Sequence, residues 1–121
     1  MSADLSTNPF DADGDHLKEE CGVYGIVGDA DAAAHTALGL HALQHRGQEA
    51  AGIVAFDGKQ FHSHRGMGHV SENFTSEVVD RLKGNMAVGH TRYATTGGTI
   101  LRNVQPLFAE LEFGGFALAH N

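Results

Sequence analysis

The sequence predicts an α+β domain in which antiparallel strands form the sheet and helices cover its faces. Three observations predict it. Short apolar runs alternate with helix-forming stretches in the order strand, helix, hairpin, helix and several further strands. Asp57-Gly58 lies between two strand-like runs and is typical of a two-residue hairpin, which joins antiparallel strands. The chain has 121 residues, 41% of them hydrophobic and 19% charged, which suits at most one globular domain.

Residues 1–20 are expected to be an unstructured acidic leader. Six acidic residues stand there against Lys18, and the apolar residues are too sparse to form a packed face. The folded body is expected to begin at Cys21 and to occupy 21–121. A short apolar run punctuated by glycine, 22–28, predicts its first, buried strand.

A helix should follow that strand, with Asp29 or Asp31 as its cap and Gly47 at its end. Leu38, Ala42 and His45 recur near helical spacing within it.

The next apolar run, 50–56, and the stretch 60–64 after the turn predict two paired strands. Ser71 is a candidate cap for a second helix, which should end before Gly84. Phe74, Val78 and Leu82 recur four apart and predict its buried face.

The remaining elements are predicted as a strand at 86–89, a loop rich in glycine and threonine at 95–103, and strands at 107–113 and 116–119. The last of these runs has only two residues after it. We therefore expect the chain to be the first part of a longer, truncated domain.

Charge and cysteine content exclude several classes of function. The leader carries most of the net charge of −7, and the nearly neutral body offers no basic surface for nucleic acid. No apolar run approaches the roughly 18 residues of a membrane span, and no signal sequence is present, so we expect a cytoplasmic protein without membrane contacts. Cys21 is the only cysteine, which excludes an internal disulfide and a cysteine-based metal cage.

Three histidines raise the question of a metal site. His62 and His64 are two apart on a predicted strand, and His69 follows close by. No acidic or cysteine residue lies at a matching spacing, and solvent-facing histidines are far commoner than ligands, so we predict no metal in this chain.

Cys21 is the strongest candidate for a chemical role. A lone cysteine beside apolar residues is most often a small core residue. Cys21, however, lies where the charged leader meets the first strand, so cleavage after Glu20 would make it the N-terminus. Its α-amine, with a pKa of about 8, would then accept the thiol proton and return it to a leaving amine. Gly22 is expected to leave its backbone open to substrate.

Four segments resemble the glutamine phosphoribosylpyrophosphate amidotransferases. They are CGVYGI (21–26), LQHRGQEAAG (43–52), GHTRYATTG (89–97) and AHN (119–121). The resemblance implies part of a glutaminase domain of the N-terminal-nucleophile hydrolase class, a four-layer α-β-β-α sandwich of two antiparallel sheets. Glucosamine-6-phosphate synthases share the Cys-Gly start and the His-Thr-Arg block. They typically have Tyr-Arg-Gly-Tyr-Asp where this chain has His45 to Glu49, and Trp where Tyr93 stands.

The resemblance implies a role for individual residues. Cys21 corresponds to the nucleophile that forms a γ-glutamyl thioester, and Arg92 to the clamp on the substrate α-carboxylate. A bidentate fork suits that role better than lysine does, although most arginines form surface salt bridges. Asn121 corresponds to the oxyanion-hole asparagine, whose amide donates to the developing negative charge. The glycine that completes the hole, and the acid that holds the substrate amine, are expected after it.

Further residues of the same motifs are expected to line or brace the pocket: Arg46, His90 and Thr95. Ordinary polarity at a helix end or strand is the competing interpretation of each. Gly97-Gly98 is a candidate hinge for a loop that closes over glutamine.

For the whole enzyme, the resemblance implies glutamine hydrolysis and transfer of ammonia to phosphoribosyl pyrophosphate, giving 5-phosphoribosylamine for purine synthesis. Mg²⁺ and a 4Fe–4S cluster are expected only in the missing remainder, with no cofactor in this segment, and the whole enzyme is expected to be a homo-oligomer. The segment alone is expected to be inactive. Two alternatives stay open: another class II amidotransferase with the same glutaminase, or a non-catalytic truncated product that binds a partner through open sheet edges.

Overall fold

A computed structural model describes residues 21–44, 50–92 and 101–120, and these form two antiparallel sheets with helices over one of them. The larger sheet has the order β1-β4-β2-β3. Its strands are β1 (Gly22–Val27), β4 (Met86–Arg92), β2 (Ala50–Phe56) and β3 (Phe61–Met67). The smaller sheet is the hairpin of β5 (Leu107–Leu111) and β6 (Gly114–Leu118). The antiparallel sheets predicted from the sequence are confirmed.

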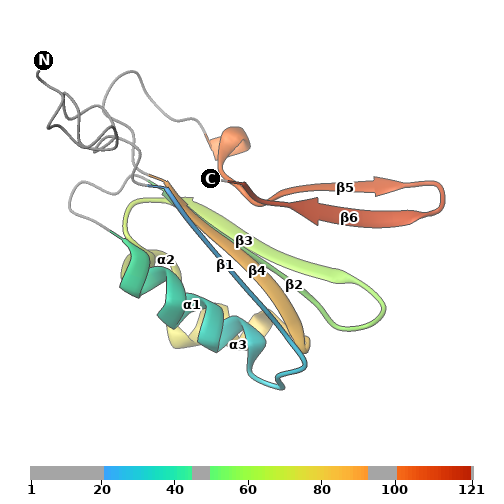
Figure 1. Cartoon of the computed structure of the whole chain (residues 1–121), viewed down its shortest axis with the longest axis horizontal. Coiled ribbons are helices and arrows are strands. Elements are labelled where there is room, and N and C mark those ends of the chain that lie inside the picture. The colour runs from blue at the N-terminus through green and yellow to red at the C-terminus, as the bar shows by residue number, and fades with distance from the viewer. Residues whose placement is uncertain (1–20, 45–49, 93–100, 121) are drawn as a thin grey trace, which may run out of the picture.

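The helices lie together on one face of the larger sheet, and the β5–β6 hairpin lies on the other side (Figure 1). They are α1 (Ala32–Leu43), α2 (Val70–Asn73) and α3 (Ser76–Arg81). The described residues thus supply three consecutive layers, helix, sheet and sheet, of the four-layer arrangement. None of their helices has the length and apolar character needed to cross a bilayer.

Small residues bring α1 close to the central strand β4. Gly89 of β4 lies beneath Thr36 and Leu40 of α1, and a Cβ at Gly89 would come within 2.6 Å of the Thr36 Cγ2 atom. Thr36 and Leu40 are fully buried, whereas Leu38 is 67% exposed. A helix was predicted here, but it ends at Leu43 instead of near Gly47, and Gln44 after it is extended. Alanine and threonine rather than leucine make most of its buried face.

The helix predicted from Ser71 to Leu82 is in fact two short helices, and His69 rather than Ser71 is the N-cap of the first. Thr75 separates them, and its Oγ1 accepts a hydrogen bond from the Val78 backbone N–H at 3.3 Å, which caps the start of α3. A polar side chain that satisfies a free N–H favours a new helix start over continuation of the old helix. The predicted apolar spacing survives the break, since Phe74 and Leu82 are buried in the core.

Other element boundaries also differ from the predictions. The β2–β3 connection spans 57–60 rather than two residues, because the Asp57 carboxylate accepts backbone hydrogen bonds from Lys59 and Gln60, both at 2.8 Å. The His62 ring, 2.8 Å from the same carboxylate, and these backbone donors hold the Asp57 pKa well below its ordinary value. Strand β4 continues past Gly89 to Arg92, which places more of the GHTR motif in the sheet.

We expect Gly89→Ala to destabilise the fold by about 1–3 kcal/mol, because its Cβ has no room beneath two fully buried side chains. Gly25→Ala is the matched control, since Gly25 lies in β1 and a Cβ there would meet nothing closer than 3.8 Å. Its effect should stay within about 0.5 kcal/mol. Urea unfolding followed by circular dichroism measures both, and equal midpoints for the two variants would contradict this account of the α1–β4 contact.

Candidate active site

The candidate residues gather where β1 begins and β4 ends. Gly22 pairs with Thr91 across these antiparallel strands, so the next position of the register brings Cys21 opposite Arg92. Opposite residues of such strands have Cα atoms roughly 4.5–5.5 Å apart. Residues 50–52, the end of the second motif, pair with Arg92, Thr91 and His90 from the other side. Three motifs far apart in the sequence therefore meet at one end of the sheet.

Alternation along β4 divides its side chains between two environments. Ala87, Gly89 and Thr91 lie on the helix side, as the contacts of Gly89 with α1 show. His90 and Arg92 lie on the opposite side, which the β5–β6 hairpin shares. The register places Cys21 on that same side.

Cys21 is half-buried and its thiol is free. It lies at the start of an edge strand rather than inside the apolar core. Its neighbour Gly22 does not have the role that the sequence suggested. A Cβ at Gly22 would lie 3.0 Å from the Leu43 Cβ and 3.3 Å from the Thr91 Cγ2 atom, so the missing side chain makes room for helix α1 rather than for substrate.

Arg92 is half-buried at the end of β4. Its Nε atom is buried and has no hydrogen-bond partner among the described residues, and no described acidic side chain forms an ion pair with it. A buried guanidinium donor without a partner costs free energy, which an anionic ligand would recover. This environment differs from the surface salt bridge that was the competing interpretation.

His90 is 1% exposed and lies beneath this site. Neither ring nitrogen has a partner in hydrogen-bond geometry within the described residues. Burial lowers the His90 pKa below its ordinary value, the His120 backbone opposes that shift, and the charges of Arg92 and His120 lower the pKa further. The buried His90 ring lies on the same face of β4 as Arg92, and its surroundings favour the neutral form.

The end of the described chain also reaches this site. His120 lies close enough to influence the His90 ring, and its backbone N–H donates to the Gln105 Oε1 atom at 2.7 Å. Sequence reasoning missed Gln105 altogether, since a glutamine before a proline has no pattern that marks it. Arg46, Thr95 and Asn121 lie outside the described residues, as do Gly97 and Gly98.

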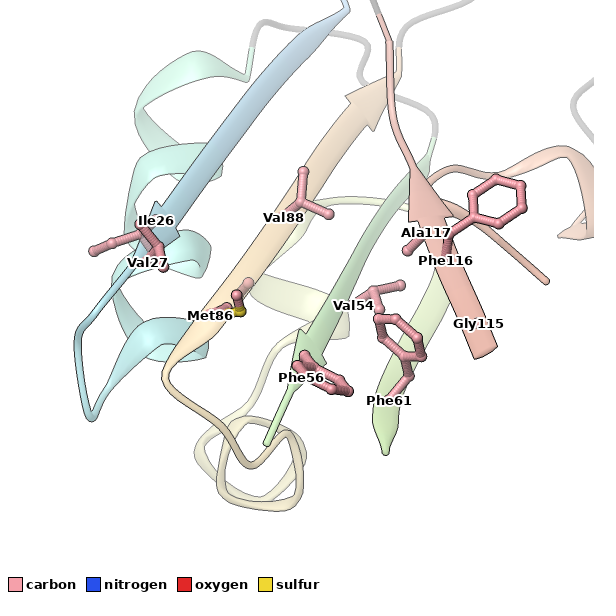
Figure 2. Close-up of a pocket in the computed structure, with 11 residues that line it drawn as sticks. Ile26, Val27, Val54, Phe56, Phe61, Met86, Val88, Gly115, Phe116 and Ala117 are labelled. Atoms are coloured by element: carbon pink, nitrogen blue, oxygen red, sulfur yellow. The ribbon is translucent and has the colours of Figure 1, made fainter. Parts of the chain in front are cut away.

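An apolar cavity of about 400 Å³ lies between the two sheets, away from Cys21 and Arg92. Figure 2 shows Phe56, Phe61 and Met86 on the side formed by the larger sheet and Phe116 of β6 on the side formed by the hairpin. The paired residues Val27 and Met86 place it at the opposite end of β1 and β4 from Cys21. Its lining carries no nucleophile or acid, and Val27, Met86 and Phe116 in it are exposed, so it is an open apolar space between the sheets rather than a second candidate for chemistry.

Two antiparallel sheets with helices over one of them, and a cysteine at the start of the first strand, match part of the N-terminal-nucleophile hydrolase fold of the solved neighbours. A solved structure described as the allosteric regulatory enzyme of purine biosynthesis superposes with a TM-score of 0.74 at 48% identity, over 78% of this chain and 21% of that one. The Bacillus subtilis glutamine phosphoribosylpyrophosphate amidotransferase complexed with ADP and GMP gives a TM-score of 0.73 at 48% identity, over 82% of this chain and 21% of that one.

Sequence comparison identifies similar proteins. An amidophosphoribosyltransferase from Rhizobium etli is 66% identical over 110 residues, 90% of this chain and 22% of its own length. One from Bacillus subtilis is 53% identical over 87% of this chain and 22% of its own length. No protein-family model matches. The chain is homologous to the N-terminal part of amidophosphoribosyltransferases and spans about a fifth of the length of these relatives.

Proposed function

We propose that this chain is the N-terminal part of the glutaminase domain of an amidophosphoribosyltransferase. The whole enzyme would hydrolyse glutamine and pass the ammonia to phosphoribosyl pyrophosphate, giving 5-phosphoribosylamine in purine synthesis. The observation that carries the proposal is the Gly22–Thr91 pair, which brings the next residues, Cys21 and Arg92, to the same end of the sheet. The buried Nε of Arg92 has no partner among the described residues. A nucleophile and a carboxylate-binding group on neighbouring strands suit an amino-acid substrate, because one can attack its side chain while the other binds its α-carboxylate.

The chemistry follows from removal of residues 1–20. The free α-amine of Cys21 takes the thiol proton, and the sulfur attacks the side-chain amide carbon of glutamine. Asn121 donates to the oxygen that becomes negative in the tetrahedral intermediate. The α-ammonium of Cys21 then returns its proton to the amide nitrogen, the carbon–nitrogen bond breaks, and ammonia leaves. Water hydrolyses the γ-glutamyl thioester to glutamate and frees the thiol.

The other motif residues support this site in the same proposal. Arg92 binds the substrate α-carboxylate, His90 braces Arg92 from the same face of β4, and Arg46 and Thr95 line the pocket. Gly97-Gly98 is the hinge of the loop that closes over glutamine.

Metal chemistry belongs to the rest of the protein in this proposal. The described residues contain no group of three or more acidic, histidine or cysteine side chains arranged to hold a metal ion. Cys21 is the only cysteine of the chain, so the four thiolates of a 4Fe–4S cluster cannot come from here. Mg²⁺ would serve the phosphoribosyl pyrophosphate site. The whole enzyme is proposed to be a homo-oligomer and, unlike the Arabidopsis relative whose name places it in the chloroplast, cytoplasmic.

Leader removal tests the mechanism directly. We expect the mature, active enzyme to begin at Cys21, because an α-nitrogen held in a peptide bond cannot accept the thiol proton. Intact-mass measurement and N-terminal sequencing identify the start, and glutamate release measures the activity of the same preparation. Full glutaminase activity in a preparation that retains residues 1–20 in every molecule would overturn the proposed mechanism.

A further inference from the structure

Gln105 connects the end of the described chain to the larger sheet. Its side-chain Oε1 accepts the backbone N–H of His120 at 2.7 Å, across a separation of 15 residues. His120 directly precedes Asn121. Because a backbone N–H only donates, the glutamine atom that faces it must be the oxygen.

The segment that carries Gln105 is itself held on β2 and β3. Arg65 of β3 donates from Nη1 to the Val104 carbonyl oxygen at 2.9 Å. Gly52 of β2 leaves room for the Gln105 backbone, since a Cβ there would lie 2.2 Å from the Gln105 carbonyl oxygen. Val104 and Pro106 on either side are fully buried. Gln105 is therefore anchored on the same face of the sheet as His90.

We propose that Gln105 is a positioning residue that fixes the backbone leading into Asn121. The inference rests on the proposed function, in which Asn121 stabilises the oxyanion. Gly52 pairs with His90, and His90 lies beside Arg92, so one hydrogen bond ties His120, the residue before Asn121, to the strands that carry His90 and Arg92. An oxyanion donor acts only when it is held where the charge develops, so loosening its backbone lowers the rate without weakening substrate binding.

Gln105→Met in the whole enzyme tests this, because methionine has similar size but no strong acceptor. Loss of one hydrogen bond should lower kcat for glutamine hydrolysis about 3- to 10-fold and leave the glutamine KM unchanged. The γ-aldehyde analogue of glutamate provides a second readout, since its adduct with the thiol is tetrahedral and places an oxygen in the oxyanion hole. Its affinity should fall by the same factor, while product glutamate affinity and ammonia-dependent synthesis stay constant.

Gln60→Met is the matched control, because Gln60 lies in the exposed 57–60 turn at the other end of the sheet and should leave every readout unchanged. Arg65→Met loosens the Gln105 segment from its other side and should give the same signature. Unchanged kcat and analogue affinity in Gln105→Met, or an equal loss of ammonia-dependent synthesis, would overturn the inference. Glutamine hydrolysis that survives Cys21→Ala would instead overturn the proposed function.

Discussion

Replacing Cys21 by alanine is expected to lower glutamine-dependent synthesis at least 10⁴-fold in the whole enzyme, because the variant has no atom that can form the thioester. Ammonia-dependent synthesis should stay within about twofold, since ammonia bypasses this site. Initial rates of phosphoribosylamine formation with each nitrogen donor measure both. The alanine is smaller than cysteine and lies at an edge strand, so the fold should persist.

Two controls make this result specific. Cys21→Ser places a hydroxyl where the thiol was. If this side chain is the nucleophile, the serine variant should hydrolyse glutamine at least as fast as the alanine variant. A Cys21→Ala enzyme that retained more than about 1% of its glutamine activity would contradict the assignment of the nucleophile.

Replacing Arg92 by lysine should raise the glutamine KM roughly 100-fold and leave ammonia-dependent synthesis unchanged. Lysine keeps the charge but loses the planar fork, and each hydrogen bond to a charged group contributes about 1.5–3 kcal/mol. Steady-state kinetics with both nitrogen donors separates this effect from general damage.

Arg81→Lys is the matched control for Arg92→Lys. Arg81 ends α3 on the helix side of the sheet and is exposed, so its replacement should leave both KM values unchanged. An Arg92→Lys enzyme with wild-type glutamine KM would make Arg92 a structural residue rather than the carboxylate clamp.

The strands of the larger sheet were largely predictable because each is a short apolar or alternating run between turn residues. The helical layer was less so. The buried face of α1 depends on how closely Gly89 lets it approach β4, and that distance is a property of the packed pair. The break between α2 and α3 depends on a competition between a Thr75 cap and continued helix, which apolar spacing does not register.

The candidate site was likewise predictable only in part. The motifs identified Cys21, His90 and Arg92, but only the strand register could bring Cys21 and Arg92 together. Gly22 was assigned to substrate access because it adjoins the cysteine, whereas its neighbour in space is Leu43. Gln105 was missed because its contact joins residues 15 positions apart through a single backbone N–H.

The division of β4 between helix side and site side makes the strand intolerant of sliding. A slip of one residue against β1 or β2 would turn Arg92 toward α1 and Thr91 toward the site, and would move Gly89 from beneath Leu40. A molecule that misaligns this strand therefore loses both the proposed alignment of Cys21 with Arg92 and its core packing in the same event. Single-residue insertions or deletions in β4 should consequently yield misfolded protein rather than folded enzyme with weakened activity. The activity per molecule of a preparation would then measure the fraction of molecules whose β4 strand is correctly aligned.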